Sequence, residues 1–189
     1  MKRKLLSILK KEAFCQKKVR LSSGRISDFY IDVRKVSLSS EGIYLISNLI
    51  LRMIKGENIS AIGGPTLGAD PIVSGVCFLA HQKKRKLKGF LIRKSPKKYG
   101  SQKMLEGKPL KPSDRVLVVD DVATSGSSII KAVKVLKEAR VKVVKALVIV
   151  DREEGAAEEL AKLGCPFSSI FTKRDFFRKK KLISRFFSV

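Results

Sequence analysis

Two adjacent carboxylates followed by a run of small hydroxyl residues form the segment of this sequence best suited to chemistry. The segment is VLVVDDVATSGSSI, residues 116–129. An apolar run that gives way to small residues and then to helical spacing is typical of a buried strand that turns into a helix. Backbone N–H groups at a helix N-terminus attract phosphate, and Gly126 lets the backbone come close to it. The loop is therefore a candidate phosphomonoester site.

The acids of this segment, Asp120 and Asp121, suit a sugar that carries such a phosphate. Carboxylates accept hydrogen bonds from a vicinal diol, and they also hold a divalent cation directly or through water. Diol and phosphate together describe a ribose 5-phosphate. The alternative is an ordinary strand-to-helix turn with a Ser or Thr cap, which requires neither the second acid nor four hydroxyl residues. The nucleotide-binding patterns G-x-x-x-x-G-K-[ST] and G-x-G-x-x-G are absent.

The elements that must position this segment alternate between strand and helix patterns. Expected strands cover 25–35 (a strand or hairpin), 59–62, 90–93, 116–119, 146–150 and 167–170. Expected helices cover 1–14, 40–55, 71–82, about 129–136 and 154–163. This order predicts an α/β fold with a mainly parallel sheet flanked by helices on both faces. Ligands of such sheets bind at the carboxyl ends of the strands, where Asp120 and Asp121 stand.

Length and composition predict a single domain over residues 1–189, since 44% of the residues are hydrophobic and no linker is visible. No stretch reaches the roughly 20 apolar residues of a membrane span, and the basic start reads as an amphipathic helix with Leu5, Leu6, Ile8 and Leu9 inward. We therefore expect a cytoplasmic protein with no membrane partner. Three scattered cysteines without C-x-x-C indicate neither a disulfide framework nor a zinc site.

The formal net charge of +24 gathers at the N-terminus, in 83–98 and in 173–185. Such charge attracts polyanions, which include nucleic acid, anionic lipid and phosphorylated small molecules. Solvated faces of a lysine-rich protein are the favoured interpretation for the two termini. For 83–98 we favour a function. Nucleic acid would suit the charge, but no motif that reads it is visible.

The segment VLVVDDVATSGSS resembles the signature with which type I phosphoribosyltransferases bind phosphoribosyl pyrophosphate (PRPP). Three further segments resemble the orotate branch of that family: LSSGRISDFYIDVRK (21–35), GFLIRKSPKKYGSQKMLEG (89–107) and IVDREEG (149–155). The resemblance implies transfer of the phosphoribosyl group of PRPP to orotate in pyrimidine (UMP) biosynthesis, giving orotidine 5'-monophosphate (OMP) and pyrophosphate. It also implies the type I fold with a small N-terminal hood over about 1–38, a mobile catalytic loop over 94–112 and a basic tail over 171–189.

The resemblance assigns roles residue by residue. It implies orotate contacts from Phe29, Tyr30, Thr124 and Arg152, and catalysis by Arg93, Lys94, Lys97, Asp120 and Asp121. The residues implied to bind PRPP are Arg93, Lys94, Lys97, Tyr99, Asp120, Asp121, Val122, Ala123, Thr124, Ser125, Gly126, Ser127 and Ser128. Mg²⁺ is the implied cofactor, held indirectly by Asp120 and Asp121 through water or PRPP. A homodimer with shared active sites is implied as well.

The chain departs from the family pattern at three places. Tyr99 stands where the loop usually has His, and Ser22 stands where some members have Lys. The loop 63–70 lacks the Lys that some members carry there. Pyrophosphate binding thus loses positive partners. Two alternatives stay open: a phosphoribosyltransferase for another base, and a regulator of the same fold that binds nucleic acid. A base-by-base activity assay separates the first, and salt-dependent nucleic-acid binding without turnover would favour the second.

Overall fold

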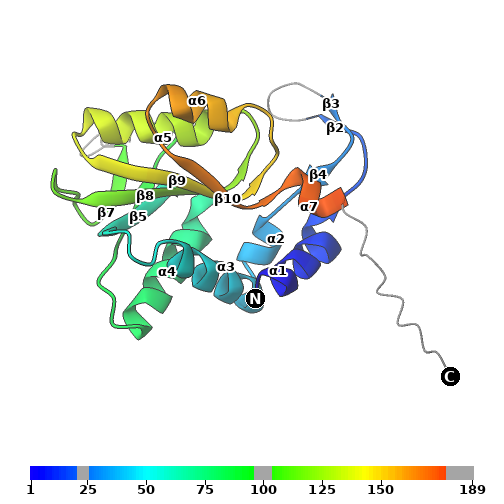
Figure 1. Ribbon diagram of the computed structural model, residues 1–189, viewed down its shortest axis with the longest axis horizontal. Coiled ribbons are helices and arrows are strands. Elements are labelled where there is room, and N and C mark those ends of the chain that lie inside the picture. The colour runs from blue at the N-terminus through cyan, green and yellow to red at the C-terminus, as the bar shows by residue number, and fades with distance from the viewer. Residues whose placement is uncertain (21–25, 96–103, 178–189) are drawn as a thin grey trace.

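A six-stranded sheet forms the centre of the computed structural model, which describes residues 1–20, 26–95 and 104–177 (Figure 1). The strand order is β10-β9-β8-β5-β6-β7, and only β7 runs antiparallel to its neighbour. The strands are β5 (Ala61–Pro65), β6 (Lys88–Ile92), β7 (Leu105–Gly107), β8 (Arg115–Ala123), β9 (Lys142–Asp151) and β10 (Phe167–Thr172). The expected mainly parallel sheet is confirmed.

Helices cover both faces of this sheet (Figure 1). On one side lie α3 (Ser40–Met53) and α4 (Ala69–Gln82), and on the other α5 (Ser127–Glu138) and α6 (Ala156–Lys162). The central strand β8 is buried on both sides: Leu117 and Val119 pack into the α3–α4 core, while Val116 and Val118 pack into the α5–α6 core. This explains its uninterrupted apolar sequence.

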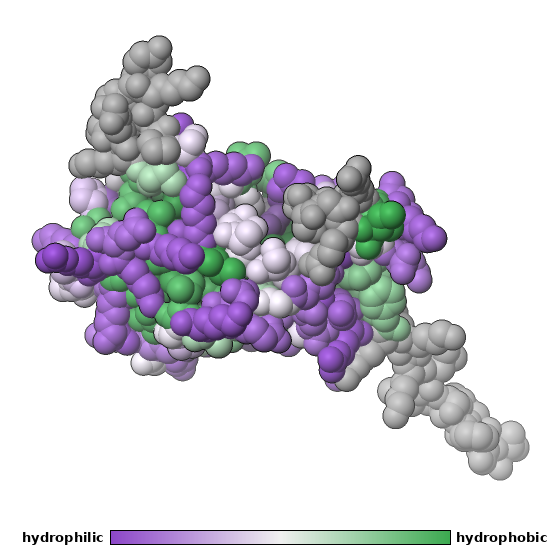
Figure 2. All heavy atoms as spheres, turned by 90° about the horizontal axis from the view of Figure 1, so that it is seen from above, coloured by the Kyte–Doolittle hydropathy of each residue, from purple (hydrophilic) through white to green (hydrophobic). Residues whose placement is uncertain are grey.

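The helix α5 shows how the sequence pattern sets its orientation. Ile129, Ala132, Val133 and Leu136 are buried against the sheet. Lysines at 131, 134 and 137 lie on the exposed side. Figure 2, viewed from above, shows hydrophilic side chains reaching over the apolar ones on this side of the molecule. The lysines of α5 therefore belong to a solvated face.

The N-terminal hood, residues 1–38, is built from short elements. They are α1 (Lys2–Ile8), the π-helical turn η1 (Leu9–Ala13), β1 (Phe14–Cys15), β2 (Val19–Arg20), β3 (Ile26–Ser27), β4 (Tyr30–Ile31) and α2 (Arg34–Ser37). β1 pairs with β4 and β2 with β3, both antiparallel. Leu5 and Leu9 are fully buried, as the amphipathic pattern predicts.

A cluster of phenylalanines joins the hood to the end of the chain. Helix α7 (Lys173–Phe177) follows β10 and places Phe176 and Phe177 against Phe14, with ring centroids 5.5 Å away in both cases. Phe29 meets Phe177 edge-on at 5.3 Å. The expected basic tail, 171–189, thus begins with the end of β10 and helix α7, whose phenylalanines pack on the hood. Within this tail, residues 178–189 lie outside the described part of the chain.

Several expected element boundaries differ from those observed. The range 94–112, expected to be one loop, contains the edge strand β7; its three residues are too few to show a periodicity. The strand expected at 116–119 runs from Arg115 to Ala123, so both aspartates belong to β8 itself. The expected strand or hairpin 25–35 is, in its described part, two short strands, β3 and β4, which pair with β2 and β1. Helix α2 then begins at Arg34, where Asp32 accepts the Arg34 N–H at 3.3 Å. Within the described residues, none of the helices has the length and apolar character needed to cross a membrane.

Candidate active site

The 124–128 loop consists of the turn between β8 and α5 and the first two residues of α5, and it lines a cavity of about 510 Å³ together with Asp120, Val122, Ala123 and Ile129. Gly126 is the N-cap of α5 and adopts a left-handed conformation with φ +75°. An added Cβ there would come within 2.9 Å of the Ala156 Cβ. The first N–H groups of α5 have no partner within the helix and suit an anion. All five loop residues predicted to bind phosphate, and Asp120, Val122 and Ala123 with them, therefore line one cavity.

The acidic pair lies at the edge of this cavity. Asp120 is 7% exposed, and its Oδ1 accepts the Asp121 N–H at 2.9 Å. The Oδ1 of Asp121 accepts the Val122 N–H at 2.7 Å. Burial, and then the neighbouring Asp121 charge, raise the pKa of Asp120 well above its usual range. Burial raises the pKa of Asp121 too, against the opposing effects of the Val122 N–H and the Arg34 charge. Two such carboxylates favour hydroxyl donors or a cation beside them.

Gly68, at the start of α4, lies directly against these carboxylates. A Cβ at this position would come within 2.5 Å of Oδ1 of both Asp120 and Asp121. The absence of a side chain therefore lets the loop 66–68 approach the acidic pair. Any ligand held by the two aspartates also lies beside this loop.

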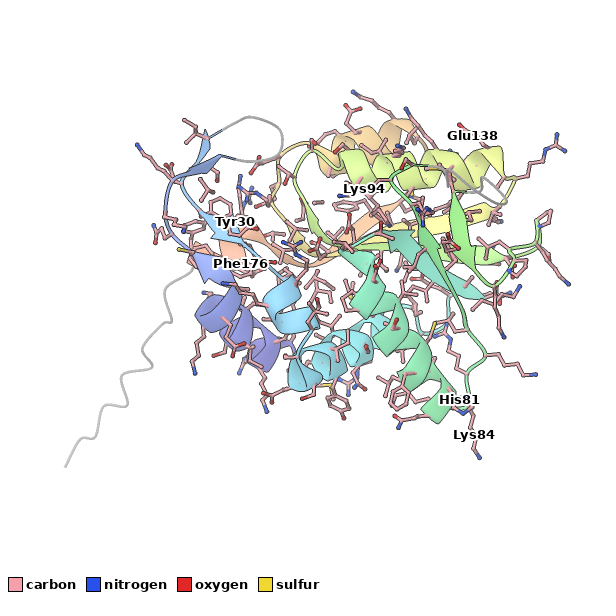
Figure 3. The ribbon with its side chains drawn as sticks, turned by 180° about the vertical axis from the view of Figure 1, so that it is seen from behind. Tyr30, His81, Lys84, Lys94, Glu138 and Phe176 are labelled. Atoms are coloured by element: carbon pink, nitrogen blue, oxygen red, sulfur yellow. The ribbon has the colours of Figure 1, made fainter. Side chains whose placement is uncertain are left out.

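A second cavity of about 480 Å³ adjoins the first and shares Asp120, Val122, Thr124 and Ser128 with it. Its other walls come from the hood, from the end of β5 and the β5–α4 loop, and from residues at or just after the ends of β6, β8 and β9. They are Tyr30, Ile31, Asp32, Arg34, Pro65, Thr66, Leu67, Gly68, Lys94, Asp121 and Arg152. In Figure 3, Tyr30 lies on the hood side and Lys94 beside α5, whose Lys131 Nζ donates to the Lys94 carbonyl at 2.8 Å. The two cavities together form one continuous site, in which Asp120 lines both halves and Asp121 lines the second.

Arg152 is the most tightly held cation of this site. It is 2% exposed, and its Nε donates to Oε1 of Glu154 at 2.9 Å. Its Nη2 donates to the Ser27 hydroxyl at 2.7 Å. The guanidinium carbon lies 4.2 Å from the ring centroid of Phe29, a distance at which cation and ring attract. Arg152 is thus fixed by hood and β9 segments that are far apart in sequence.

The aromatic pair predicted to lie by the orotate ring separates in the structure. Tyr30 lines the second cavity and is 37% exposed. Phe29 is 9% exposed and does not line either cavity; it packs on Phe14 and Phe177 and supports Arg152. The alternation of a strand places these neighbours on opposite sides, so only one of them can face the site.

The predicted lid residues are only partly brought to the site. Lys94 lines the second cavity. Arg93 lines neither cavity; its Nη1 lies 3.4 Å from Oε1 of Glu106 on β7. Lys97 and Tyr99, like Ser22, lie outside the described residues.

Two charged residues of the site, Asp32 and Arg34, were missed in the sequence. The sequence carries a signal for these two residues, because polar and apolar residues alternate from Tyr30 to Arg34. Tyr30, Asp32 and Arg34 line the cavity, whereas the apolar Ile31 and Val33 are 4% and 0% exposed. Ile31 contributes to the wall as well. Within the described part of the chain, no group of three or more His, Cys, Asp or Glu residues is arranged to hold a metal ion. A cation at Asp120 and Asp121 would therefore need ligand and water oxygens to complete its coordination.

Comparison with known proteins agrees with this geometry. The phosphoribosyl transferase domain family matches residues 74–169. The orotate phosphoribosyltransferase of Aquifex aeolicus is 41% identical over 152 residues, which cover 80% of this chain and 82% of the relative. That of a Bradyrhizobium species (strain BTAi1) is 36% identical over 92% and 95% of the two chains.

Solved structures give the same result. The orotate phosphoribosyltransferase of Mycobacterium tuberculosis H37Rv in complex with Fe(III) dicitrate superposes with a TM-score of 0.81 at 33% identity, covering 94% of this chain and 99% of that one. The same enzyme in complex with PRPP superposes with a TM-score of 0.76 at 30% identity, covering 93% and 98%. On fold, site and relatedness, this chain belongs to the orotate phosphoribosyltransferase family.

Proposed function

We propose that this protein transfers the phosphoribosyl group of PRPP to orotate, which gives OMP and pyrophosphate, a step of pyrimidine (UMP) biosynthesis. The observation that carries the proposal is the continuous site that brings together the 124–128 loop, the acidic pair and Arg152. A ribose 5-phosphate in the first cavity would direct its anomeric carbon toward the second. A planar anionic base in the second cavity would then meet a guanidinium.

The acidic pair would hold the ribose during this reaction. The base nitrogen displaces pyrophosphate at the anomeric carbon, and the sugar gains positive charge in the transition state. Asp120 and Asp121 would accept the ribose hydroxyls and stabilise that charge. The N–H groups of residues 126–128 would hold the 5-phosphate, with Thr124, Ser125, Ser127 and Ser128 as hydroxyl donors.

The orotate ring would lie between the hood and the end of β9. Arg152 uses Nε and Nη2 to bind Glu154 and Ser27. Its Nη1 has no partner within the described residues and would meet the orotate carboxylate. Tyr30 and Thr124 line the same cavity and would contact the ring. These three residues would set the choice of base.

A lid would cover the reacting groups. We assign Lys94, Lys97 and Tyr99 to it as donors to the departing pyrophosphate, and Arg93 as the residue that begins it. Closure would exclude water, which otherwise hydrolyses an activated sugar. Removal of one well-placed donor is expected to lower the rate by about 10²–10³-fold.

The donor set fits Mg²⁺ held mainly by the substrate. Asp120 and Asp121 are two oxygen donors whose pKa values are raised mainly by burial. They would hold the ion through water or ribose hydroxyls, and the ion would neutralise pyrophosphate charge when bound.

We also propose a homodimer. An exposed apolar strip begins beside the second cavity with Leu67 (63% exposed) and Leu38 (74%). On α4, the partly buried Pro71 lines a groove with Leu38 and Leu67, and the exposed Phe78 (65%) lies seven residues further on, on the same face of the helix. Exposed apolar strips of this kind commonly mark protein contacts. Light scattering during size-exclusion chromatography measures the mass; a monomer at micromolar concentration would contradict this assembly.

The activity is tested by following the loss of orotate absorbance in the presence of PRPP and Mg²⁺. Wild type is expected to consume orotate. Lys97→Ala, Asp121→Asn and Arg152→Ala are each expected to lose most of this activity. Adenine, guanine and uracil are tested in parallel. No orotate turnover by wild type, or turnover only with another base, would overturn the proposal.

A further inference from the structure

The second cavity must accept a strongly anionic group beside two carboxylates. Under the proposed function, the pyrophosphate of PRPP leaves from a carbon next to Asp120 and Asp121. Asp32 adds a third acid to the wall. An anion in such a place is unstable unless cations face it. The described cations that line this cavity are Arg34, Lys94 and Arg152.

Two neighbouring arginines are engaged elsewhere. Arg152 is bound to Glu154 and Ser27 on the side of the cavity that takes the base. Arg93 lies by Glu106 and outside the cavity wall. Arg34 differs from both: it lines the second cavity together with the β5–α4 loop, and of its guanidinium nitrogens only Nε has a hydrogen-bond partner among the described residues.

The guanidinium of Arg34 is aimed by one contact. Oδ1 of Asp32 accepts both the backbone N–H of Arg34 at 3.3 Å and its Nε at 3.0 Å. The terminal nitrogens Nη1 and Nη2 have no partner among the described residues. These two nitrogens form the edge that binds two phosphate oxygens at once. The hydrogen bond and charge of Asp32, and then the charge of Asp121, raise the pKa of Arg34, which places Arg34 within electrostatic reach of the acidic pair.

The same cavity is lined by the loop Thr66–Leu67–Gly68, which leads into the 14-residue helix α4. Its backbone lies against the acidic pair at Gly68. The loop 63–70 contains no Lys or Arg. Backbone N–H groups and a helix N-terminus favour phosphate but carry no full charge. A cation from another element is therefore needed on this side of the cavity.

We propose that Arg34 binds the pyrophosphate group of PRPP and the pyrophosphate product, and that Asp32 is the residue that positions it. The hood then closes the leaving-group end of the site as well as the base end. Arg34 supplies the charge that the loop 63–70 lacks. This inference rests on the proposed function.

The test is the affinity of Arg34→Ala for magnesium pyrophosphate and for PRPP, measured by titration calorimetry beside its affinity for OMP. OMP fills the phosphate, ribose and base positions but has no pyrophosphate. Loss of a hydrogen-bonding cation is expected to weaken pyrophosphate and PRPP binding by about 10- to 100-fold. OMP binding is expected to change by less than about threefold, which also shows that the variant is folded. Arg34→Lys keeps the charge without the fork and is expected to fall between the two.

Lys35→Ala is the matched control. Lys35 is the next residue of α2 and is exposed, and it lines the neighbouring groove with Leu38 and Pro71 instead of this cavity. Its removal deletes the same charge from the same helix and is expected to leave pyrophosphate affinity unchanged. Equal pyrophosphate affinity in Arg34→Ala and wild type, or equal losses in Arg34→Ala and Lys35→Ala, would overturn the inference. Either result leaves the proposed function standing if wild type still consumes orotate; failure of wild type to do so defeats the proposed function itself.

Discussion

Replacing Gly126 by alanine should damage both the fold and phosphate binding. The residue has φ +75°, a conformation that costs an alanine about 1–2 kcal/mol. Its new Cβ would lie 2.9 Å from the Ala156 Cβ and 3.1 Å from the Ala156 Cα. Ala156 is buried at the start of α6, so the bend must move; overpacking of this kind costs about 1–3 kcal/mol. We expect the free energy of unfolding to fall by roughly 2–5 kcal/mol.

Movement of the bend also moves the N–H groups at the start of α5. Loss of one hydrogen bond to a charged phosphate costs about 1.5–3 kcal/mol, so OMP affinity should fall about 10- to 150-fold. Urea unfolding and an OMP titration measure the two effects.

Gly164→Ala is the control for backbone strain. Gly164 has φ +62° with nothing within 4 Å of an added Cβ. It should lose only about 1–2 kcal/mol of stability and keep wild-type OMP affinity. Wild-type OMP affinity in Gly126→Ala would refute the assignment of this bend to the phosphate.

Three further predictions concern charged groups. Asp120→Asn should abolish activity yet raise the melting temperature at pH 7, because the raised pKa of Asp120 means that its ionised form destabilises the fold. The difference in melting temperature between this variant and wild type should shrink as the pH falls below that pKa. A melting temperature below that of wild type at pH 7 would contradict this prediction. Asp114 is bound by Lys88 Nζ at 2.7 Å, which is the main reason that its pKa is lowered to about 2. Asp114→Asn should therefore lower the free energy of unfolding by roughly 2–3 kcal/mol at pH 7. In urea melts, this difference from wild type should vanish as the pH falls from 4 toward 2. A difference in unfolding free energy that does not change with pH would refute the prediction. Glu154→Gln should raise the KM for orotate about 3- to 10-fold and leave the KM for PRPP nearly unchanged, because it removes the charged partner that orients Arg152. Steady-state kinetics measure both constants. Equal increases in the two KM values would count against a role of Glu154 in orienting Arg152.

The order of elements and the phosphate loop could be predicted because both rest on local patterns. The apolar run before Asp120 and the small residues after it need no knowledge of distant contacts, and the structure places them as expected at the carboxyl end of β8. The strand β7 could not be predicted, because it is an edge strand of three residues that pairs only with β6, and so short a strand carries no periodicity.

The directions of the side chains in the hood could not be predicted from the sequence either. Phe29 and Tyr30 resemble an aromatic pair at the base, but the alternation of the backbone sends Phe29 under Arg152 and Tyr30 into the cavity. The place of Arg34 depends on the contact of Asp32 with the start of α2 and on the approach of the hood to the β5–α4 loop. Such contacts between elements distant in sequence cannot be read from spacing alone.

The central claim is that the bend 124–128 holds the sugar phosphate while Asp120 and Asp121 hold the ribose hydroxyls. A crystal structure of the OMP complex tests it most directly. The account predicts phosphate oxygens within hydrogen-bonding distance of the N–H groups of residues 126–128, and the 2'- and 3'-hydroxyls at the two carboxylates. A nucleotide bound with its phosphate elsewhere and this bend empty would contradict it.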